Sequence, residues 1–338
     1  MGSGAFTLGE HVKGSHWVGK RFAGYFDPSK PYLDGYKAYF VKSGAVVPGI
    51  LGGQFDAEFR GRNPSEKAQL LDKMKDNLTV HEGTWVNNLM LVFNTTRKPF
   101  DDIKVRQALT MAIDRWGGSD ALSKISILKY VGGAMRPGFA MSLPESELVK
   151  LPGFAKDINK SRDAAKKLLE QAGLKDLKFK LLNRNIPEPY TPGGVYSIDQ
   201  WRRIGVTAEH EQLETKLYQE RVAKGDFDVA VEFQADFMDD PTAQFSKYLT
   251  KKLSPSGYSG HTDTKIDDLY EKQRRTMNVA ERTKVVNELE RYSLTQAYNV
   301  PILWWQRIIV YNKKIQGWYM TPSHYLWQDL TTVWLDQS

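Results

Sequence analysis

The 338-residue sequence contains no cysteine. Disulfide bonds, thiol catalysis and cysteine-ligated metals are therefore excluded. Histidine is also sparse, and the six residues show no i, i+4 pair of the kind that a helical zinc site uses; they stand at positions 11, 16, 81, 210, 261 and 324. The sequence therefore predicts no metal site.

Glycine-rich phosphate-binding loops are missing as well. Neither G-x-x-x-x-G-K-[ST] nor G-x-G-x-x-G occurs, although these turns hold nucleotides and dinucleotides in many enzymes. Gly257–His261 (GYSGH) is similar to the nucleophile elbow of serine hydrolases, but its second glycine comes one position early. We therefore predict no cofactor and no serine-hydrolase chemistry.

Charge of one sign is not concentrated anywhere. Lys and Arg total 47 against 40 Asp and Glu, for a formal net charge of +7, and the densest basic clusters are pairs such as Lys251-Lys252. Nucleic-acid binding needs a concentrated basic stripe, so this class of partner is disfavoured. Neither a membrane span nor a signal peptide is visible. The first four residues, MGSG, are typical of a cloning remnant, so we expect the chain to begin inside a longer natural protein.

The most informative stretch is Asn87–Arg115. It contains Leu89–Phe93 (LMLVF), an apolar run that predicts a strand buried on both faces. Pro99 ends this strand region, and Asp101 or Asp102 is expected to cap a new helix. That helix has one apolar face at helical spacing, formed by Val105, Ala108, Leu109, Ala112 and Ile113. A buried strand that leads into a capped amphipathic helix indicates the core of an α/β unit.

Strands and helices then alternate. We expect a helix over 162–172, capped by Ser161, and after it strand, helix, strand, helix and strand at 177–182, 196–204, 206–213, 215–224 and 227–233. This order predicts a βαβαβ unit with a parallel sheet. Elsewhere we expect antiparallel strands over 5–41 and an irregular excursion over 116–160, then helices near 263–277 and 279–297 and strands near 301–305, 308–312 and 331–335.

Glu232–Pro241 (EFQADFMDDP) is the most informative polar cluster and follows the strand predicted at 227–233. Ligands of parallel sheets bind beyond the carboxyl ends of the strands, and carboxylates there can neutralise a cationic group such as the α-amine of a peptide. Asp239 or Asp240 is expected to cap a helix that begins near Pro241, whereas Asp236 is too far upstream. A hydrolase or transferase that uses Asp236 and Asp239 is the alternative from another class.

These segments resemble the extracytoplasmic solute-binding proteins of ABC transporters, in the family of dipeptide and oligopeptide receptors. The resemblance is carried by Asn94, Pro99-Phe100-Asp101-Asp102, Val105-Arg106-Gln107-Ala108, Ala112-Ile113-Asp114-Arg115, Lys30-Pro31-Tyr32-Leu33-Asp34-Gly35 and Ala235-Asp236-Phe237. It implies an α/β fold of two lobes, similar to periplasmic binding proteins of the type II, Venus-flytrap kind.

The resemblance also implies a domain organisation. Residues 1–84 would form a strand-rich part of the first lobe, residues 85–312 the second lobe, and residues 313–338 a return to the first. The opening strands of the first lobe have no counterpart here, so we expect that lobe to be incomplete. An incomplete lobe should leave unpaired strand edges and exposed apolar surface.

Ligand-binding residues are inferred partly from the resemblance. In peptide receptors of this family the matching aspartate pairs with the free amine of the peptide, which implies that role for Asp236, beside Phe237. Strand ends and loops that face the cleft supply further candidates, namely Arg184, Tyr258, Trp304, Trp305 and Arg307. Alternatively, Arg184 is a surface cation and Arg307 a surface salt-bridge partner. Because strand residues alternate, one ring of the tryptophan pair should face the core and the other the cleft.

The function that the resemblance implies is transport without chemistry. The protein would capture a peptide or similar amine-bearing solute between two lobes in the periplasm and deliver it to an ABC permease in the inner membrane. A third hypothesis is a chaperone-like or sensor-partner descendant of the same fold. The sequence does not determine which solute is bound.

Overall fold

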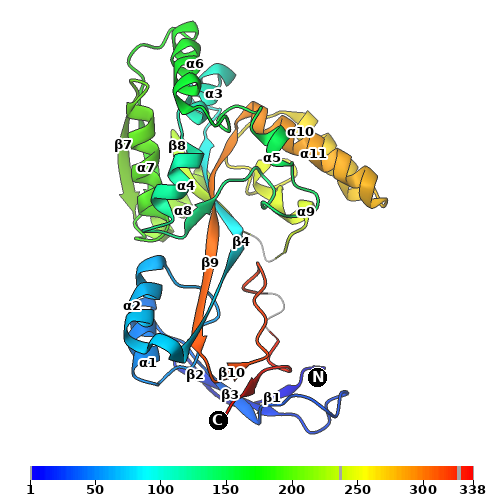
Figure 1. Ribbon diagram of the computed structural model, residues 1–338. Coiled ribbons are helices and arrows are strands. Elements are labelled where there is room, and N and C mark those ends of the chain that lie inside the picture. The colour runs from blue at the N-terminus through cyan, green and yellow to red at the C-terminus, as the bar shows by residue number, and fades with distance from the viewer. Residues whose placement is uncertain (1, 236–237, 326–328, 338) are drawn as a thin grey trace. The chain divides into compact units, whose positions relative to one another are not determined.

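The computed structural model describes residues 2–235, 238–325 and 329–337. Its contacts divide the chain into two compact units, which we call unit 1 (Met1–Gly83 with Arg307–Ser338) and unit 2 (Thr84–Gln306) (Figure 1). Two long strands, β4 (Leu78–Phe93) and β9 (Asn299–Asn312), contribute residues to both units. We expected the return to the first lobe after residue 312, whereas unit 1 resumes at Arg307, within the uninterrupted strand β9.

Unit 1 begins with the antiparallel strands that the N-terminal sequence predicted. They form a three-stranded sheet in the order β1 (Phe6–Val12), β2 (His16–Arg21), β3 (Gly35–Tyr39). Gly14 lies in the turn between β1 and β2 with a φ of +76°, a conformation that favours glycine. Leu8 is 71% exposed and Phe40 48% exposed, so apolar surface lies open on this sheet, as predicted for an incomplete lobe.

The rest of unit 1 packs short helices on the end of β9. Its elements are η1 (Ser43–Ala45), α1 (Val46–Leu51), α2 (Pro64–Met74), η2 (Lys75–Asn77), β10 (Ile315–Gln316) and β11 (Trp334–Leu335). Asn63 and Glu66 form a capping box that satisfies two N–H groups at the start of α2. The buried residues of α1, α2 and β9 share one small core, which contains Val46, Val47, Ile50, Leu70, Ile308 and Val310.

Unit 2 is built on a six-stranded mixed sheet in the order β5-β9-β4-β8-β6-β7. Its further strands are β5 (Leu128–Tyr130), β6 (Lys178–Arg184), β7 (Thr207–Leu213) and β8 (Val229–Ala235). β6 is parallel to both β7 and β8, which confirms the predicted βαβαβ unit, while β4 runs antiparallel to β8 and β5 antiparallel to β9.

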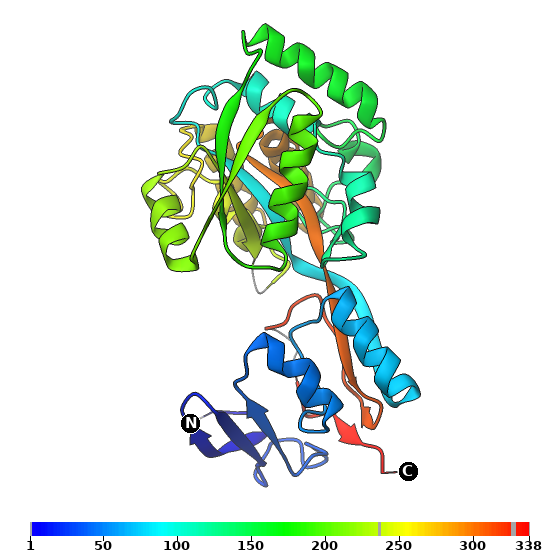
Figure 2. The same cartoon turned by 90° about the vertical axis from the view of Figure 1, so that its left-hand side faces the viewer.

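Helices cover both faces of this sheet (Figures 1 and 2). Alternate residues of β4 enter two different cores, with Leu89, Leu91 and Phe93 in one and Met90 and Val92 in the other. The predicted strand buried on both faces is therefore confirmed. The first core takes residues from α3 (Ile103–Met111), α6 (Ile158–Gln171) and α7 (Tyr190–Arg202), and the second from α8 (Thr215–Lys224), α10 (Thr264–Arg275) and α11 (Val279–Gln296).

The polar residues of Asn87–Arg115 serve the fold of unit 2. The Asn94 amide donates to two main-chain carbonyls just before β8, each at 2.9 Å. Asp102 caps α3, and Asp114 caps α4 (Arg115–Leu122), each by accepting a main-chain N–H in the first turn. Of the two aspartates considered for the first cap, Asp102 is thus the residue used.

Three expected boundaries were wrong. α6 begins at Ile158 with Asp157 as its cap, because that carboxylate accepts from Lys160 N at 3.1 Å, while Ser161 lies inside the helix. The excursion over 116–160 contains α4, β5 and the short α5 (Glu145–Leu148). The two strands predicted at 301–305 and 308–312 are the single strand β9.

The start of α7 was also predicted too late, because its first turns contain two glycines. These glycines are there for packing: a Cβ at Gly193 would lie 2.0 Å from Leu89 Cδ2. The small residue lets α7, which begins at Tyr190, approach β4 closely.

Candidate functional site

A buried ion pair joins the parallel strands β6 and β8. Arg184, the last residue of β6, donates from Nη2 to Glu232 Oε1 at 2.6 Å, and the two side chains are 4% and 6% exposed. The guanidinium also lies 4.4 Å from the ring centroid of Tyr190 and 4.2 Å from that of Tyr218. Burial lowers the pKa of Arg184, but the Glu232 carboxylate, Tyr218 and Tyr190 together raise it by more, so the net shift of the pKa is upward.

The prediction that Arg184 is a surface cation was therefore wrong, because the side chain is enclosed by two rings and a carboxylate. A ligand carboxylate would have to compete with Glu232 for this guanidinium. Direct ligand contact by Arg184 stays a prediction.

Lys247 adds a second cation beside Glu232. Its Nζ donates to the main-chain oxygen of Phe233 at 2.6 Å and lies 3.6 Å from Glu232 Oε2. Burial lowers the pKa of Lys247, and the Glu232 carboxylate opposes this effect. Lys247 belongs to η3 (Ser246–Tyr248), after the short helix α9 (Pro241–Gln244). No local pattern in the sequence indicated it, because only the fold brings η3 against β8.

The tryptophan pair of β9 lies on this part of the sheet. Trp304 is fully buried and donates from Nε1 to Gly133 O at 3.0 Å. Trp305 is 6% exposed and stacks on Phe233 with ring centroids 6.3 Å apart. Both rings are therefore buried, and Trp305 belongs to the core that contains Leu89. The expectation that one ring faces a cleft, and a solute contact by either ring, remain predictions.

A side-chain amide network holds the end of β8. Gln234 donates from Nε2 to Ala134 O at 2.6 Å and to Gln244 Oε1 at 2.7 Å. Its Oε1 accepts from Asn88 Nδ2 at 2.9 Å and from the Tyr248 hydroxyl at 3.2 Å. The end of β8 is therefore tied to β4, to the loop after β5 and to α9.

Asp236 and Phe237, predicted as ligand contacts, lie outside the described residues. The two aspartates that follow have separate partners. Asp240 caps α9 by accepting from Thr242 N at 2.8 Å, which confirms that one of the pair serves as a cap. Asp239 accepts from Arg136 through both of its carboxylate oxygens, at 3.0 and 2.8 Å from Nε.

Glu290 of α11 anchors the loop that carries Arg136. Its Oε1 accepts from Met135 N and its Oε2 from Leu143 N, each at 2.9 Å. A Cβ at Gly133 would lie 2.3 Å from Glu290 Oε1, so glycine is required for this approach. Burial raises the pKa of Glu290 to about 7, although the main-chain N–H groups oppose the shift.

This pKa predicts a pH dependence of stability. Because the folded-state pKa lies above the ordinary value of 4.5, the folded protein holds a proton between pH 4.5 and about 7 that the unfolded chain has released. The contribution of Glu290 to stability therefore falls as pH rises through this window, by about 2–3 kcal/mol. Urea unfolding of the wild type and of Glu290→Gln at pH 5 and pH 8 measures it. A difference between the two proteins that does not change with pH would contradict the prediction.

Arg307 lies in unit 1 and holds the main chain together there. Its guanidinium donates to the carbonyl oxygens of four residues and is fully buried; the acceptors are Phe59, Arg60 (3.2 Å), Thr321 (2.6 Å) and Ser323 (2.8 Å). The prediction of a surface salt-bridge partner was therefore wrong. Burial lowers the pKa of Arg307 to about 10, so the side chain keeps its charge at neutral pH.

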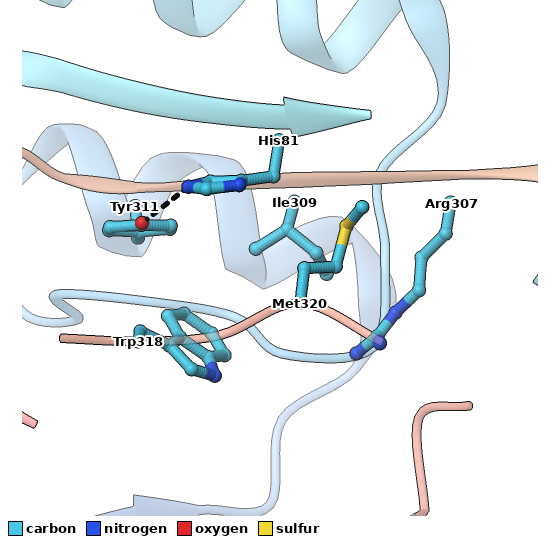
Figure 3. Close-up of a pocket in the computed structure, with 6 residues that line it drawn as sticks. All are labelled: His81, Arg307, Ile309, Tyr311, Trp318 and Met320. Carbon is cyan, nitrogen blue, oxygen red and sulfur yellow. Dashed lines mark hydrogen bonds between the residues drawn. The ribbon is translucent and has the colours of Figure 1, made fainter. Parts of the chain in front are cut away.

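Figure 3 shows the small cavity of unit 1 that Arg307 lines, with Trp318 and Met320 nearby. His81 stacks on Tyr311, and its Nε2 lies 2.7 Å from the Tyr311 hydroxyl (Figure 3). The cavity has no room for a water molecule, so it is a packing feature. The remaining candidate, Tyr258, is half-buried against the core beneath α8, α10 and α11.

Unit 2 also carries an open groove of about 800 Å³ beside the edge strand β5. The loop anchored by Glu290 forms one wall, through Met135 and Leu143, and α4 contributes Trp116 and Asp120 on the other side. Within residues 2–235, 238–325 and 329–337, no group of three or more acidic or histidine side chains could hold a metal ion. In the same residues no helix is long and apolar enough to cross a membrane.

Comparison with known proteins identifies the class. Residues 1–255 match the sequence profile of a family described as bacterial extracellular solute-binding proteins, family 5, middle. The match covers more than half of the chain, and the protein belongs to this family. The family predicted from the Asn94–Arg115 motif is thereby confirmed.

Two curated relatives show how much of a family member this chain represents. The dipeptide-binding protein of Escherichia coli strain K12 is 25% identical over 329 residues, covering 95% of this chain and 59% of the relative. The glutathione-binding protein of Shigella flexneri serotype 5b is 22% identical over 337 residues, covering 96% of this chain and 62% of the relative. The chain thus spans about 60% of the length of these relatives.

Solved structures confirm the fold class. An ABC transporter substrate-binding protein of Listeria monocytogenes matches with a TM-score of 0.82 and 21% identity, over 99% of this chain and 67% of that one. A periplasmic binding protein of Helicobacter pylori, in complex with the peptide STSA, matches with a TM-score of 0.78 and 20% identity, over 99% and 63%. The α/β fold of this chain is therefore that of periplasmic solute-binding proteins.

Proposed function

We propose that this protein acts as the solute-binding component of an ABC importer, capturing a peptide or a similar amine-bearing solute in the periplasm and delivering it to a permease in the inner membrane. The observation that carries the proposal is the family match over residues 1–255. Two relatives support it, because one is a dipeptide-binding protein and the other a glutathione-binding protein. Asp236, which follows the firmly anchored end of β8, is the proposed partner of the solute amine.

Isothermal titration tests this function most directly. The panel consists of trialanine, its N-acetylated form, glutathione and a disaccharide. We expect heat from a free-amine peptide and none from the acetylated one, because acetylation removes the charge that Asp236 would neutralise. If the protein binds the disaccharide and none of the peptides, the assignment as a peptide-binding protein is refuted.

The geometry gives little support to an enzyme that uses Asp239 as a catalytic acid or base. Both oxygens of this carboxylate already accept from the Arg136 guanidinium, whereas a catalytic acid or base must reach the proton of a substrate. A receptor returns its ligand unchanged. Chromatography of the peptide after incubation therefore separates the two hypotheses, since hydrolysis would produce new peaks.

A further inference from the structure

One side chain of unit 2 connects three segments that are far apart in the sequence. Arg136, in the loop after β5, contacts Asp239 with Nη2 at 2.7 Å from Oδ2, in addition to the two contacts of Nε. Its Nη1 donates to Thr84 Oγ1 at 2.7 Å. Arg136 is 12% exposed and Asp239 20%, so solvent weakens this two-pronged contact little.

The partners of Arg136 lie in β4, which contributes residues to both units, and directly before the cap of α9. Thr84 is the first residue of unit 2 and belongs to β4, one of the two strands that pass from unit to unit. Asp239 directly precedes Asp240, which caps α9, in the segment that leads from the end of β8. A planar guanidinium can hold both at once, whereas a lysine ammonium would be a single point charge on a flexible stem.

The loop that presents Arg136 is itself held from α11. Glu290 accepts Met135 N on one oxygen and Leu143 N on the other, so one carboxylate closes the loop around Arg136. Tyr248 and Arg291 are the ionisable neighbours of this carboxylate. The pKa of Tyr248 is raised far above its usual value by burial, so this hydroxyl stays neutral at any pH of interest.

We propose that Arg136 is a positioning residue of the solute site. Its contacts with Asp239 and Thr84, which we call the Arg136 link, fix residues 238–240 to the first residue of unit 2. Glu290 holds the loop from which Arg136 acts. The term solute site rests on the proposed function, whereas the Arg136 link does not depend on it. Loss of Arg136 then loosens the segment before α9, and loss of the Glu290 carboxylate loosens the same segment indirectly.

Amide hydrogen exchange of the ligand-free protein, followed by mass spectrometry, tests the Arg136 link without any solute. The variants are Arg136→Met, which keeps the length of the stem, and Glu290→Gln, which keeps the shape but places an N–H₂ group opposite Leu143 N. Arg136→Lys is a second substitution at the same position, which keeps the charge but loses the two-pronged contact. Arg221→Met is the matched control: Arg221 pairs with Glu211 at 2.7 Å, both are 24% exposed, and the pair lies away from the loop.

Arg136→Met is expected to raise exchange over residues 238–245 at least about tenfold, and Arg136→Lys to do so less. Glu290→Gln should raise exchange over both 134–143 and 238–245, and Arg221→Met over neither. The Arg136 link is refuted if residues 238–245 exchange in Arg136→Met at the rate of the wild type. It is also refuted if Arg221→Met shows the same increase as Arg136→Met. Increased exchange at 134–143 alone in Glu290→Gln overturns the role of Glu290.

Titration with trialanine then tests the consequence for binding. If the wild type binds, Arg136→Met should weaken the affinity at least about tenfold while Arg221→Met leaves it unchanged. Unchanged affinity in Arg136→Met would overturn its positioning role. A wild type that binds no member of the panel would instead refute the proposed function. The exchange measurements would still decide whether the Arg136 link exists.

Discussion

Replacing Arg115 with methionine is expected to lower the free energy of unfolding of unit 2 by about 3–5 kcal/mol, because several hydrogen bonds from a charged donor to buried oxygens are lost. Arg115 is 1% exposed and burial lowers its pKa to about 9, so it remains charged at neutral pH. Its guanidinium donates to Pro301 O at 2.8 Å, to Gly153 O at 2.5 Å and to the main-chain and side-chain oxygens of Thr110.

The reason for so large an effect is that the acceptors are buried. Arg115 joins the start of α4 to β9 and to the loop before α6. Methionine would remove the guanidinium donors from these buried oxygens, and each buried group left unsatisfied costs about 1–3 kcal/mol.

Urea unfolding followed by tryptophan fluorescence measures the loss at Arg115. Arg202→Met is the control, because Arg202 is 80% exposed and pairs with Asp199 of the same helix. We expect the control to unfold at nearly the wild-type urea concentration. Equal midpoints for the two variants would show that the buried contacts of Arg115 contribute little.

The second large effect concerns binding. Asp236→Asn is expected to weaken the affinity for a free-amine peptide by about 2–5 kcal/mol, because the neutral amide cannot compensate the charge of an amine that has lost its water. The stability of the protein should change little. Isothermal titration of the wild type and the variant with the same peptide gives the difference directly.

Asp226→Asn is a suitable control for Asp236→Asn. It also removes one carboxylate, but Asp226 is 55% exposed and pairs with Arg97 and Arg221 on the surface. The control should bind the peptide as the wild type does. If Asp236→Asn also keeps its affinity, Asp236 does not pair with the amine, and the role implied by the resemblance is refuted.

Local sequence was enough to predict the core of unit 2. The run Leu89–Phe93 is apolar at every position because its side chains enter two cores, and this pattern is visible without a structure. The order of strands and helices from 177 to 233 likewise predicted the parallel sheet. Two of the errors fell where glycine or capping chemistry competes with helix propensity, at Gly193 and Asp157.

Burial of charge could not be predicted in this way. Arg184 and Arg307 were both considered as surface residues, yet one is enclosed by Tyr190 and Tyr218 and the other by main-chain carbonyls. Several of their partners come from distant segments, such as Glu232, which is 48 residues from Arg184, and Arg60, which is 247 residues from Arg307. A charged side chain carries the same letter in either environment, and only the packed neighbours decide which one it meets.

The sequence by itself determined the family, the α/β class and the carboxylate-rich segment after β8, because motifs and periodicity are local properties of the chain. Only the tertiary structure decided that Asp239 is held by Arg136, that Glu290 anchors the loop of Arg136, and that Lys247 lies against Glu232. Each of these contacts joins residues whose separation along the chain carries no signal. Folding of the sheet and its helices brings them within hydrogen-bonding distance, and there their charges acquire partners.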